Sequence, residues 1–211
     1  MFLYIYYFFR SVFLRGLVNT FKLLRAEGAY EKQFGIATAL IKKSNSKQFY
    51  HYQGASYWVL LKILPQIVKQ TSSFTFFDIG CGKGRAVFVA EYCGYNNLLG
   101  IDLDSELITV ANENLKKYKK QNNSSTINFK YANALDVMYK NEPTVYFLFN
   151  PFNEDILKKV LGTICSYTVS ETWFVYMNPQ YTKPFNTKNF KLITELKTNR
   201  YLEAVVYKLV L

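Results

Sequence analysis

Residues 76–85, FFDIGCGKGR, join an apolar run, an acidic residue and three glycines at alternate positions. The apolar run predicts a short buried strand, and the residues from Arg85 onward predict a helix. Because glycine lacks a Cβ, a turn built on Gly80, Gly82 and Gly84 lets a ligand approach the bare backbone. The turn amides and the helix N-terminus form an electropositive nest. We therefore expect this turn to bind a nucleotide-like cofactor.

Apolar runs and amphipathic stretches alternate along the rest of the chain. Strands are predicted over residues 75–78, 97–102, 127–131, 144–149 and 172–177, and helices over 54–69, 85–93, 105–119 and 154–167. Two β-rich runs, 190–197 and 201–210, predict an antiparallel hairpin. We expect Ser105 to cap its helix and Pro65 to end or bend the helix that contains it. Alternating strands and helices form a parallel sheet covered on both faces, and such sheets bind ligands at the carboxyl ends of their strands.

Two acidic residues flank the glycine turn in the predicted sheet. Asp78 stands two residues before Gly80, and Asp102 closes the next strand, where a carboxylate can bind a ribose diol. The spacing is GxGxG, one residue shorter than the nicotinamide-type GxGxxG. This pattern resembles the class I S-adenosylmethionine-dependent methyltransferases, over about residues 54–211. The resemblance implies an α/β, three-layer Rossmann-like fold with a mostly parallel seven-stranded sheet and a C-terminal antiparallel hairpin, here preceded by N-terminal helices.

The resemblance implies that the glycine turn holds the methionine end of S-adenosylmethionine. Asp78 would organise the turn and hold the methionine ammonium, directly or through water. Gly80, Gly82 and Gly84 would border the methionine and the ribose. The alternative for this whole set of residues is a doubly wound fold that binds another ligand.

The resemblance places the nucleoside on the next two strand ends. Asp102 would bind the ribose hydroxyls, with Asp104 as the alternative ligand, and Leu103 would pack on the adenine. Asn133, followed by Ala134, stands where the family usually has Asp as the contact to the adenine amino group. An Asn carbonyl can still accept that hydrogen bond.

The segment Tyr52-Gln53-Gly54-Ala55 precedes the first helix of the expected fold. Small bacterial methyltransferases, and related mitochondrial-type protein lysine methyltransferases with membrane-proximal N-termini, carry a Tyr-x-Pro-Thr-like segment here that closes over the cofactor. Gly54-Ala55 replaces Pro-Thr in this chain. The resemblance implies that Tyr52 and Gln53 cover the methionine end of the cofactor, and an aromatic helix entry is the alternative.

Asn150-Pro151-Phe152 ends the predicted fourth strand and is the candidate catalytic motif. It resembles the Asn/Asp-Pro-Pro-Tyr/Phe motif of amino-methyltransferases, although it has a single proline. There the Asn side chain and the next carbonyl accept hydrogen bonds from the target amine, so that catalysis is mostly positioning. A simple strand-ending turn with Phe152 in the core is the alternative, and we expect the second Asn-Pro pair, Asn178-Pro179, only to end a strand.

The composition favours a globular domain in a reducing compartment. The 211 residues include 26 Lys and Arg against 15 Asp and Glu, a net charge of +11, and half are hydrophobic. Solubility explains this charge, and a basic face for nucleic acid, anionic lipid or an acidic partner is the alternative. Cys81, Cys93 and Cys165 form no CxxC pair, which argues for the cytoplasm and against disulfides or zinc. His51 is the only histidine, so we expect neither a Ser-His-Asp site nor a metal.

Residues 1–50 are predicted to form an amphipathic helical extension, and residues 51–211 the cofactor-binding domain. Residues 1–9 are almost wholly apolar, yet they supply about half of the roughly 20 residues that a spanning helix needs. A helical wheel separates polar from apolar positions in the residues that follow. The polar positions are Ser11, Arg15, Asn19, Lys22 and Arg25, and the apolar ones are Phe13, Leu14, Leu17, Phe21 and Leu24. Such a helix packs on the core or a partner chain, or lies in the interface at the inner face of a membrane.

These features together predict a methyltransferase that uses S-adenosylmethionine to methylate nitrogen. A protein lysine is the leading acceptor, because the N-terminal helix and the Tyr52 segment favour it. A nucleic-acid base or a small-molecule amine is the alternative within this class of enzyme. A non-catalytic scaffold with a cofactor fold is the alternative outside it.

Overall fold

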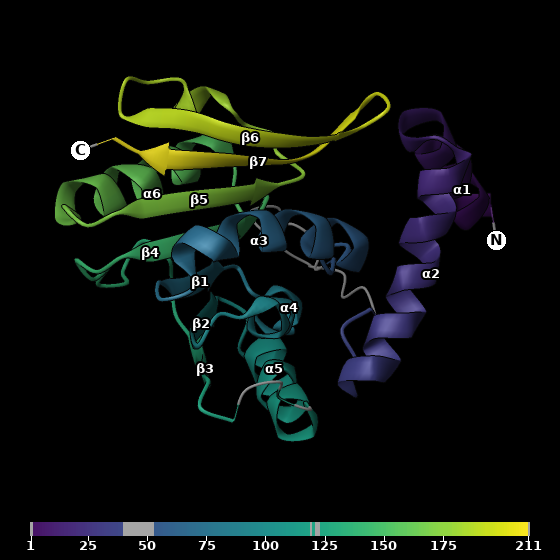
Figure 1. Cartoon of the computed structure of the whole chain (residues 1–211), viewed down its shortest axis with the longest axis horizontal. Coiled ribbons are helices and arrows are strands. Elements are labelled where there is room, and N and C mark those ends of the chain that lie inside the picture. The colour runs from purple at the N-terminus through teal and green to yellow at the C-terminus, as the bar shows by residue number, and fades with distance from the viewer. Residues whose placement is uncertain (1, 40–52, 119, 121–122, 211) are drawn as a thin grey trace.

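A seven-stranded sheet organises the protein, whose computed structural model describes residues 2–39, 53–118, 120 and 123–210. The strand order is β3-β2-β1-β4-β5-β7-β6 (Figure 1). The strands are β1 Thr75–Ile79, β2 Asn97–Asp102, β3 Thr126–Tyr131, β4 Thr144–Phe149, β5 Thr172–Met177, β6 Phe190–Thr198 and β7 Tyr201–Leu209. The first five are mutually parallel, and β7 is antiparallel to both β5 and β6. The predicted fold class is therefore confirmed.

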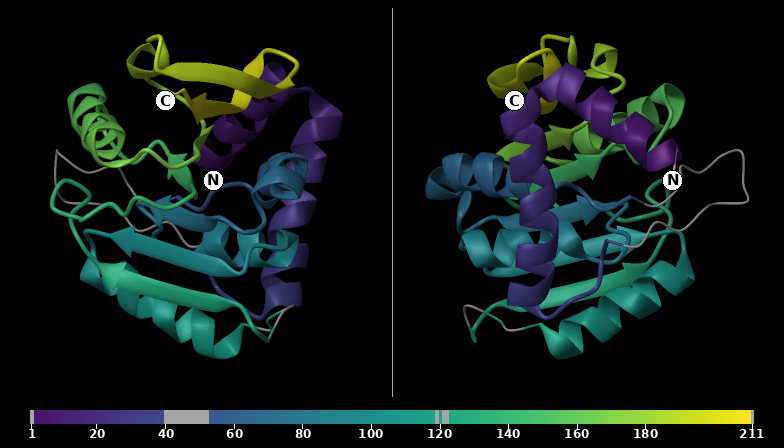
Figure 2. Two further views of the ribbon diagram at one scale, coloured as in Figure 1. Left: turned by 60° about the vertical axis from the view of Figure 1, so that its left-hand side comes forward. Right: turned by 90° about the vertical axis from the view of Figure 1, so that its right-hand side faces the viewer.

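Helices cover both faces of the sheet and make three layers (Figures 1 and 2). The helices are α1 Phe2–Arg15, α2 Leu17–Phe34, α3 Tyr57–Thr71, α4 Arg85–Cys93, α5 Ser105–Lys117 and α6 Glu154–Tyr167, with a short 3-10 turn at Lys183–Phe185. Helices α3, α4 and α5 contribute to one core cluster, and α6 to the other. Neighbouring strand residues divide between the clusters: Phe76 lies in the first and Phe77 in the second. This alternation is the period of two that a strand imposes on its side chains.

Three local expectations are corrected by the structure. The cap of α5 is Asp104 and not Ser105, because the Asp104 carboxylate accepts the backbone N–H groups of Glu106 and Leu107 at 2.9 and 3.3 Å. Helix α3 continues through Pro65 to Thr71, so this proline does not end the helix. The amphipathic helix expected across residues 11–25 is interrupted between α1 and α2, because Gly16 has a φ of +83°.

The N-terminal helices pack on the sheet domain through α3 and the β6–β7 hairpin. The N–H of Arg200 donates to the carbonyl of Leu14 at 2.9 Å, and the Arg15 guanidinium pairs with the buried Glu203 at 2.5 Å. Within the described ranges, every helix is too short or too polar to cross a bilayer. The same part of the chain holds no cluster of His, Cys, Asp or Glu suited to a metal ion.

Candidate functional site

The glycine turn after β1 has the backbone conformation that the sequence predicts. Gly80, Gly82 and Gly84 all have positive φ angles, of +83°, +53° and +87°. The N–H groups of Gly80 and Cys81 both donate to the carbonyl of Ile101 at 2.9 Å, which ties the turn to the end of β2. A Cβ on Gly84 would lie 2.5 Å from the Phe129 ring. Both the backbone angle and the packing therefore require glycine here.

Asp102 closes the turn from the end of β2. One carboxylate oxygen accepts the N–H of Gly82 at 2.8 Å, and the other accepts the N–H of Asp104 at 2.9 Å. Burial raises the pKa of Asp102, and these two hydrogen bonds oppose the rise. Asp104, the alternative ribose ligand, uses its own carboxylate to cap α5. Asp102 is thus the carboxylate held at the turn, with lone pairs left to accept a further hydroxyl.

Asp78 is buried at the end of β1 with an unsatisfied oxygen. Its side chain is 2% exposed, and Oδ1 has no hydrogen-bond partner among the residues that the structure describes. Burial, together with the charge of Asp102, raises the pKa of Asp78 well above its usual value. It lines a pocket of about 20 Å³, also lined by Gln53, Gly54 and Phe149. An orphaned buried acceptor of this kind fits a small cationic donor such as an ammonium group.

The Asn150-Pro151 turn lies against the glycine turn. A Cβ on Gly80 would stand 2.8 Å from the Cβ of Pro151, so the ends of β1 and β4 are in direct contact. Asn150 has a φ of +46°, which makes its backbone left-handed. Phe152 is partly buried and packs against the core cluster to which α6 contributes. The structure therefore places the candidate catalytic motif beside the candidate cofactor turn.

Tyr176 on β5 holds the Asn150 side chain, and the sequence analysis missed it. The Tyr176 hydroxyl donates to Asn150 Oδ1 at 3.1 Å and accepts the N–H groups of Gln180 and Tyr181 at 3.3 and 3.4 Å. Burial raises the pKa of Tyr176, so the hydroxyl stays a donor at neutral pH. No spacing rule joins these residues, because they meet only when β4 and β5 pair.

The adenine side of the predicted site lies after β2 and β3. Leu103 is exposed there and Ala134 is buried. Asn133 is engaged within its own turn: Oδ1 accepts the N–H of Leu135 at 3.1 Å, and Nδ2 donates to Asp136 at 2.9 Å. Its carbonyl keeps a second lone pair for a ligand. The N–H of Ala132 donates to the carbonyl of Asp102 at 3.0 Å, which sets this turn beside the ribose position.

The Tyr52 segment is described only in part. Tyr52 lies outside the described residues, and so does His51, whereas Gln53 lines the pocket beside Asp78. Gly54 stands so close to the Arg85 guanidinium that a Cβ would lie 2.6 Å from it. Gly54 is therefore required by the approach of Arg85, whatever Tyr52 does.

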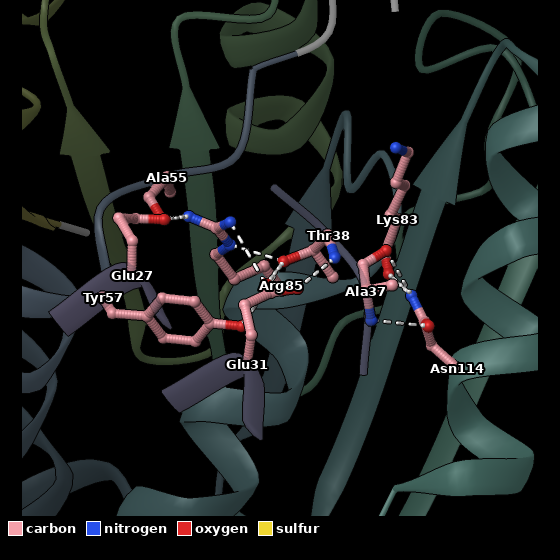
Figure 3. A network of polar contacts seen from close by, with 9 residues as sticks. All are labelled: Glu27, Glu31, Ala37, Thr38, Ala55, Tyr57, Lys83, Arg85 and Asn114. Atoms are coloured by element: carbon pink, nitrogen blue, oxygen red, sulfur yellow. Dashed lines mark hydrogen bonds and ion pairs between the residues drawn. The ribbon is translucent and has the colours of Figure 1, made fainter. Parts of the chain in front are cut away.

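Arg85 joins the glycine turn to α2, which the sequence analysis did not foresee (Figure 3). This first residue of α4 is 3% exposed, and its guanidinium donates to Glu27 at 2.6 Å, to the carbonyl of Ala55 at 2.8 Å and to Glu31 at 3.3 Å. It also lies 4.3 Å from the centre of the Tyr57 ring. The buried cation therefore fixes α2 and the segment before α3 against the wall of the pocket.

Asn114 of α5 makes a second tie between the N-terminal segment and the turn (Figure 3). Its Oδ1 accepts the N–H of Ala37 at 3.1 Å, and its Nδ2 donates to the carbonyl of Lys83 at 3.2 Å. The glycine turn is thus held from both sides by residues that belong to distant parts of the chain. The domain boundary expected at residue 50 falls outside the described residues.

Sequence comparisons match part of the chain to one family. A family model described as ribosomal protein L11 methyltransferase (PrmA) matches residues 58–175. The ribosomal protein L11 methyltransferase of Alkaliphilus oremlandii (strain OhILAs) is 38% identical over 64 residues, 30% of this chain and 20% of that protein. One from Clostridium perfringens is 41% identical over 64 residues, 30% of this chain and 19% of that protein. The chain thus spans about a fifth of the length of the curated relatives that it matches.

Solved structures share the fold at low sequence identity. Magnesium protoporphyrin IX methyltransferase from Synechocystis PCC 6803, with bound SAM, has a TM-score of 0.55 at 12% identity over 72% of this chain and 77% of that one. The ribosomal protein L11 methylase from Lactobacillus delbrueckii subsp. bulgaricus has a TM-score of 0.51 at 17% identity over 70% of this chain and 76% of that one. At these low sequence identities, the two structures support the shared fold alone.

Proposed function

Because the chain belongs to the ribosomal protein L11 methyltransferase (PrmA) family, we propose that this protein is an S-adenosylmethionine-dependent methyltransferase. We propose further that it methylates the nitrogen of a protein lysine. The curated relatives are named for a ribosomal protein, which supports a protein acceptor. A solved neighbour with bound SAM supports the cofactor.

The contact between Gly80 and Pro151 carries this proposal. It sets the turn expected to hold the cofactor directly against the turn expected to hold the acceptor, because no Cβ separates them. A donor and an acceptor must approach closely for group transfer, and fixing that approach is a large part of catalysis.

The residues at the turn fit the chemical groups of S-adenosylmethionine, which supplies a sulfonium methyl group when bound. The unsatisfied Asp78 carboxylate would hold the methionine ammonium in the small pocket with Gln53. Asp102 would accept the ribose hydroxyls while it keeps the N–H of Gly82. Leu103 would cover the adenine from its exposed position at the end of β2.

Asn150 would orient the acceptor amine, and Tyr176 would hold Asn150 in place. An amide oxygen has two lone pairs, so Asn150 Oδ1 can keep the Tyr176 hydroxyl and still accept an amine N–H. We expect Asn150→Ala to lower the turnover number at least 10-fold and Tyr176→Phe to lower it less, with the affinity for S-adenosylhomocysteine unchanged in both. Steady-state kinetics and calorimetry measure the two effects. A fully active Asn150→Ala variant would make this residue purely structural.

A radiolabelled methyl assay tests the acceptor. The full chain is incubated with labelled S-adenosylmethionine and lysate, and the products are treated with protease or nuclease. We expect protease-sensitive label that acid hydrolysis recovers as methyllysine. Nuclease-sensitive label would move the acceptor to nucleic acid, for which the net charge of +11 is the supporting observation. A protein that binds no S-adenosylhomocysteine in calorimetry would be a scaffold and not an enzyme.

A further inference from the structure

The N-terminal helices expose apolar side chains along their length. Nine large apolar residues there are 46 to 65% exposed. We call them the N-terminal apolar face: Ile5, Tyr6, Tyr7, Phe9, Phe13, Leu17, Val18, Phe21 and Leu24. Scattered apolar side chains are normal on a protein surface, but a continuous set of this kind marks an interaction site.

Six of these residues form an apolar stripe that runs along α1 and α2 on either side of the bend at Gly16. Ile5, Phe9 and Phe13 follow one another at helical i, i+4 spacing on α1, and Leu17, Phe21 and Leu24 continue the pattern on α2. The rings of Phe8 and Phe21 meet edge to face, with their centres 6.0 Å apart, so the two helices touch across the bend.

Some polar residues of these helices anchor them to one another and to the body of the protein. Ser11 bonds to Thr20 at 3.0 Å, and Arg15 pairs with Glu203, which is itself buried against β6. Arg15 also lies 4.0 Å from the centre of the Tyr201 ring. On α2, Leu23, Ala26 and Phe34 pack on the core cluster, so the exposed apolar side chains lie on the opposite side of that helix. The face is therefore held toward the outside by specific contacts.

The charges around the face are all of one sign. Residues 1–26 contain Arg10, Arg15, Lys22 and Arg25 and no Asp or Glu. Arg10, Lys22 and Arg25 are exposed, and Arg200 adds a further cation 4.9 Å from the centre of the Phe13 ring. Aromatic and aliphatic side chains rimmed by Lys and Arg are the composition of helices that lie in the interface of an anionic membrane.

We propose that the N-terminal apolar face binds the interfacial region of an anionic lipid bilayer. A second copy of the chain fits the face less well, because a symmetric pair would bring two sets of cations together without a carboxylate from these segments. No helix among the described residues is long and apolar enough to cross a bilayer, and we place the face in the bilayer surface. In both views of Figure 2, α1 runs from the bend toward the edge where the parallel strands end.

Vesicle flotation of the full chain tests this proposal without reference to activity. We expect the protein to float with vesicles of phosphatidylcholine and phosphatidylglycerol, and at least 10-fold less with phosphatidylcholine alone. The triple variant Phe9→Ser, Phe13→Ser, Phe21→Ser should lower the bound fraction at least 10-fold. The triple variant Arg10→Gln, Lys22→Gln, Arg25→Gln should remove the preference for anionic vesicles.

A matched control removes three exposed apolar side chains elsewhere on the surface: Met138→Ser, Tyr167→Ser and Val169→Ser. This variant should float like the unaltered protein, and unchanged thermal unfolding would show that all variants are folded. Equal losses in the control and face variants would overturn the proposal, as would a wild-type protein that stays unbound. A wild-type dimer that the face variants convert to a monomer would assign the face to a second copy.

Discussion

The glycine turn and the N-terminal apolar face place polar and apolar groups in opposite ways. At the turn, the Asp102 carboxylate accepts two backbone N–H groups, and Oδ1 of the buried Asp78 has no partner among the described residues. On the N-terminal apolar face, apolar side chains are exposed, and the ion pair of Arg15 with Glu203 anchors the helices. Helix α2 takes part in both, because it exposes apolar side chains in its first half while Glu27 and Glu31 pair with Arg85. Amphipathic spacing thus gives two sides of a helix, and the rest of the fold decides which side faces inward.

Arg85→Met gives the largest expected effect, because it leaves Glu27 and Glu31 partly buried beside the turn without their cation. Breaking a buried ion pair from one side destabilises a protein by about 4 kcal/mol, and urea unfolding measures the loss. The control is Arg10→Met on the exposed face, with an expected change within about 0.5 kcal/mol. If Arg85→Met does not fold, Arg85→Lys keeps the charge and should show an intermediate loss. Equal effects at positions 85 and 10 would contradict the network as a structural tie.

Asp102→Ala comes next, because it removes the carboxylate expected to bind the ribose. Two hydrogen bonds to a charged acceptor are worth about 3 kcal/mol, so the affinity for S-adenosylhomocysteine should fall about 100-fold in calorimetry. Asp104→Ala is the matched control. It loses the cap of α5, worth about 1 kcal/mol of stability, and should keep the affinity. A control that loses affinity to the same extent would move the ribose ligand to Asp104.

Gly84→Ala and Gly16→Ala compare the turn with the bend of the N-terminal helices, where the glycines have ψ angles of 8° and 157°. Both residues have positive φ, at +87° and +83°, but a Cβ on Gly84 meets Phe129 and one on Gly16 meets nothing within 4 Å. The conformation of Gly16 is nearly exclusive to glycine, so we expect backbone strain alone to cost about 2 kcal/mol in Gly16→Ala. Gly84 is left-handed helical, which costs Ala about 1 kcal/mol, and the clash with Phe129 should raise the loss in Gly84→Ala to about 3 kcal/mol in urea unfolding. A loss of only about 1 kcal/mol in Gly84→Ala would mean that packing at the turn relaxes freely.

The smallest expected effect concerns Asp78, through the coupling of its protonation to stability and to ligand binding. Its pKa in the folded protein is raised, so the free protein loses stability as the pH rises from the unfolded pKa toward the folded one. An ammonium group bound beside Asp78 favours the carboxylate, so binding should release up to one proton. The affinity for S-adenosylhomocysteine should rise with pH over the same range.

Calorimetry in buffers of different ionisation enthalpy counts the protons released on binding. Asp78→Asn should abolish the release, weaken binding and leave the free protein at least as stable, since the buried charge is gone. Proton release that persists in Asp78→Asn would assign the linkage to another group.

Much of the fold and the core of the candidate site could be predicted from the sequence. The strands of the sheet and the turn at Gly80 to Gly84 follow from local patterns: short apolar runs, and glycines that tolerate positive φ. The expected membership of the methyltransferases is confirmed by the family match over residues 58–175. The cap at Ser105 was wrong because two adjacent residues both favour capping, and Asp104 makes both amide bonds.

Contacts between distant segments could not be predicted in this way. In the sequence, Arg85 is an ordinary helix residue, and its role becomes visible only where α2 and Ala55 surround it. In the same way, Tyr176 is an ordinary strand residue in the sequence, and only the folded sheet shows that its hydroxyl donates to Asn150. The sequence by itself determined the elements, the glycine turn and the family, because these depend on local backbone chemistry and spacing. Only the tertiary structure decided how the turn is held, what touches Asn150 and which side of the N-terminal helices faces outward. These features depend on partners far away in the chain, whose positions no local pattern specifies.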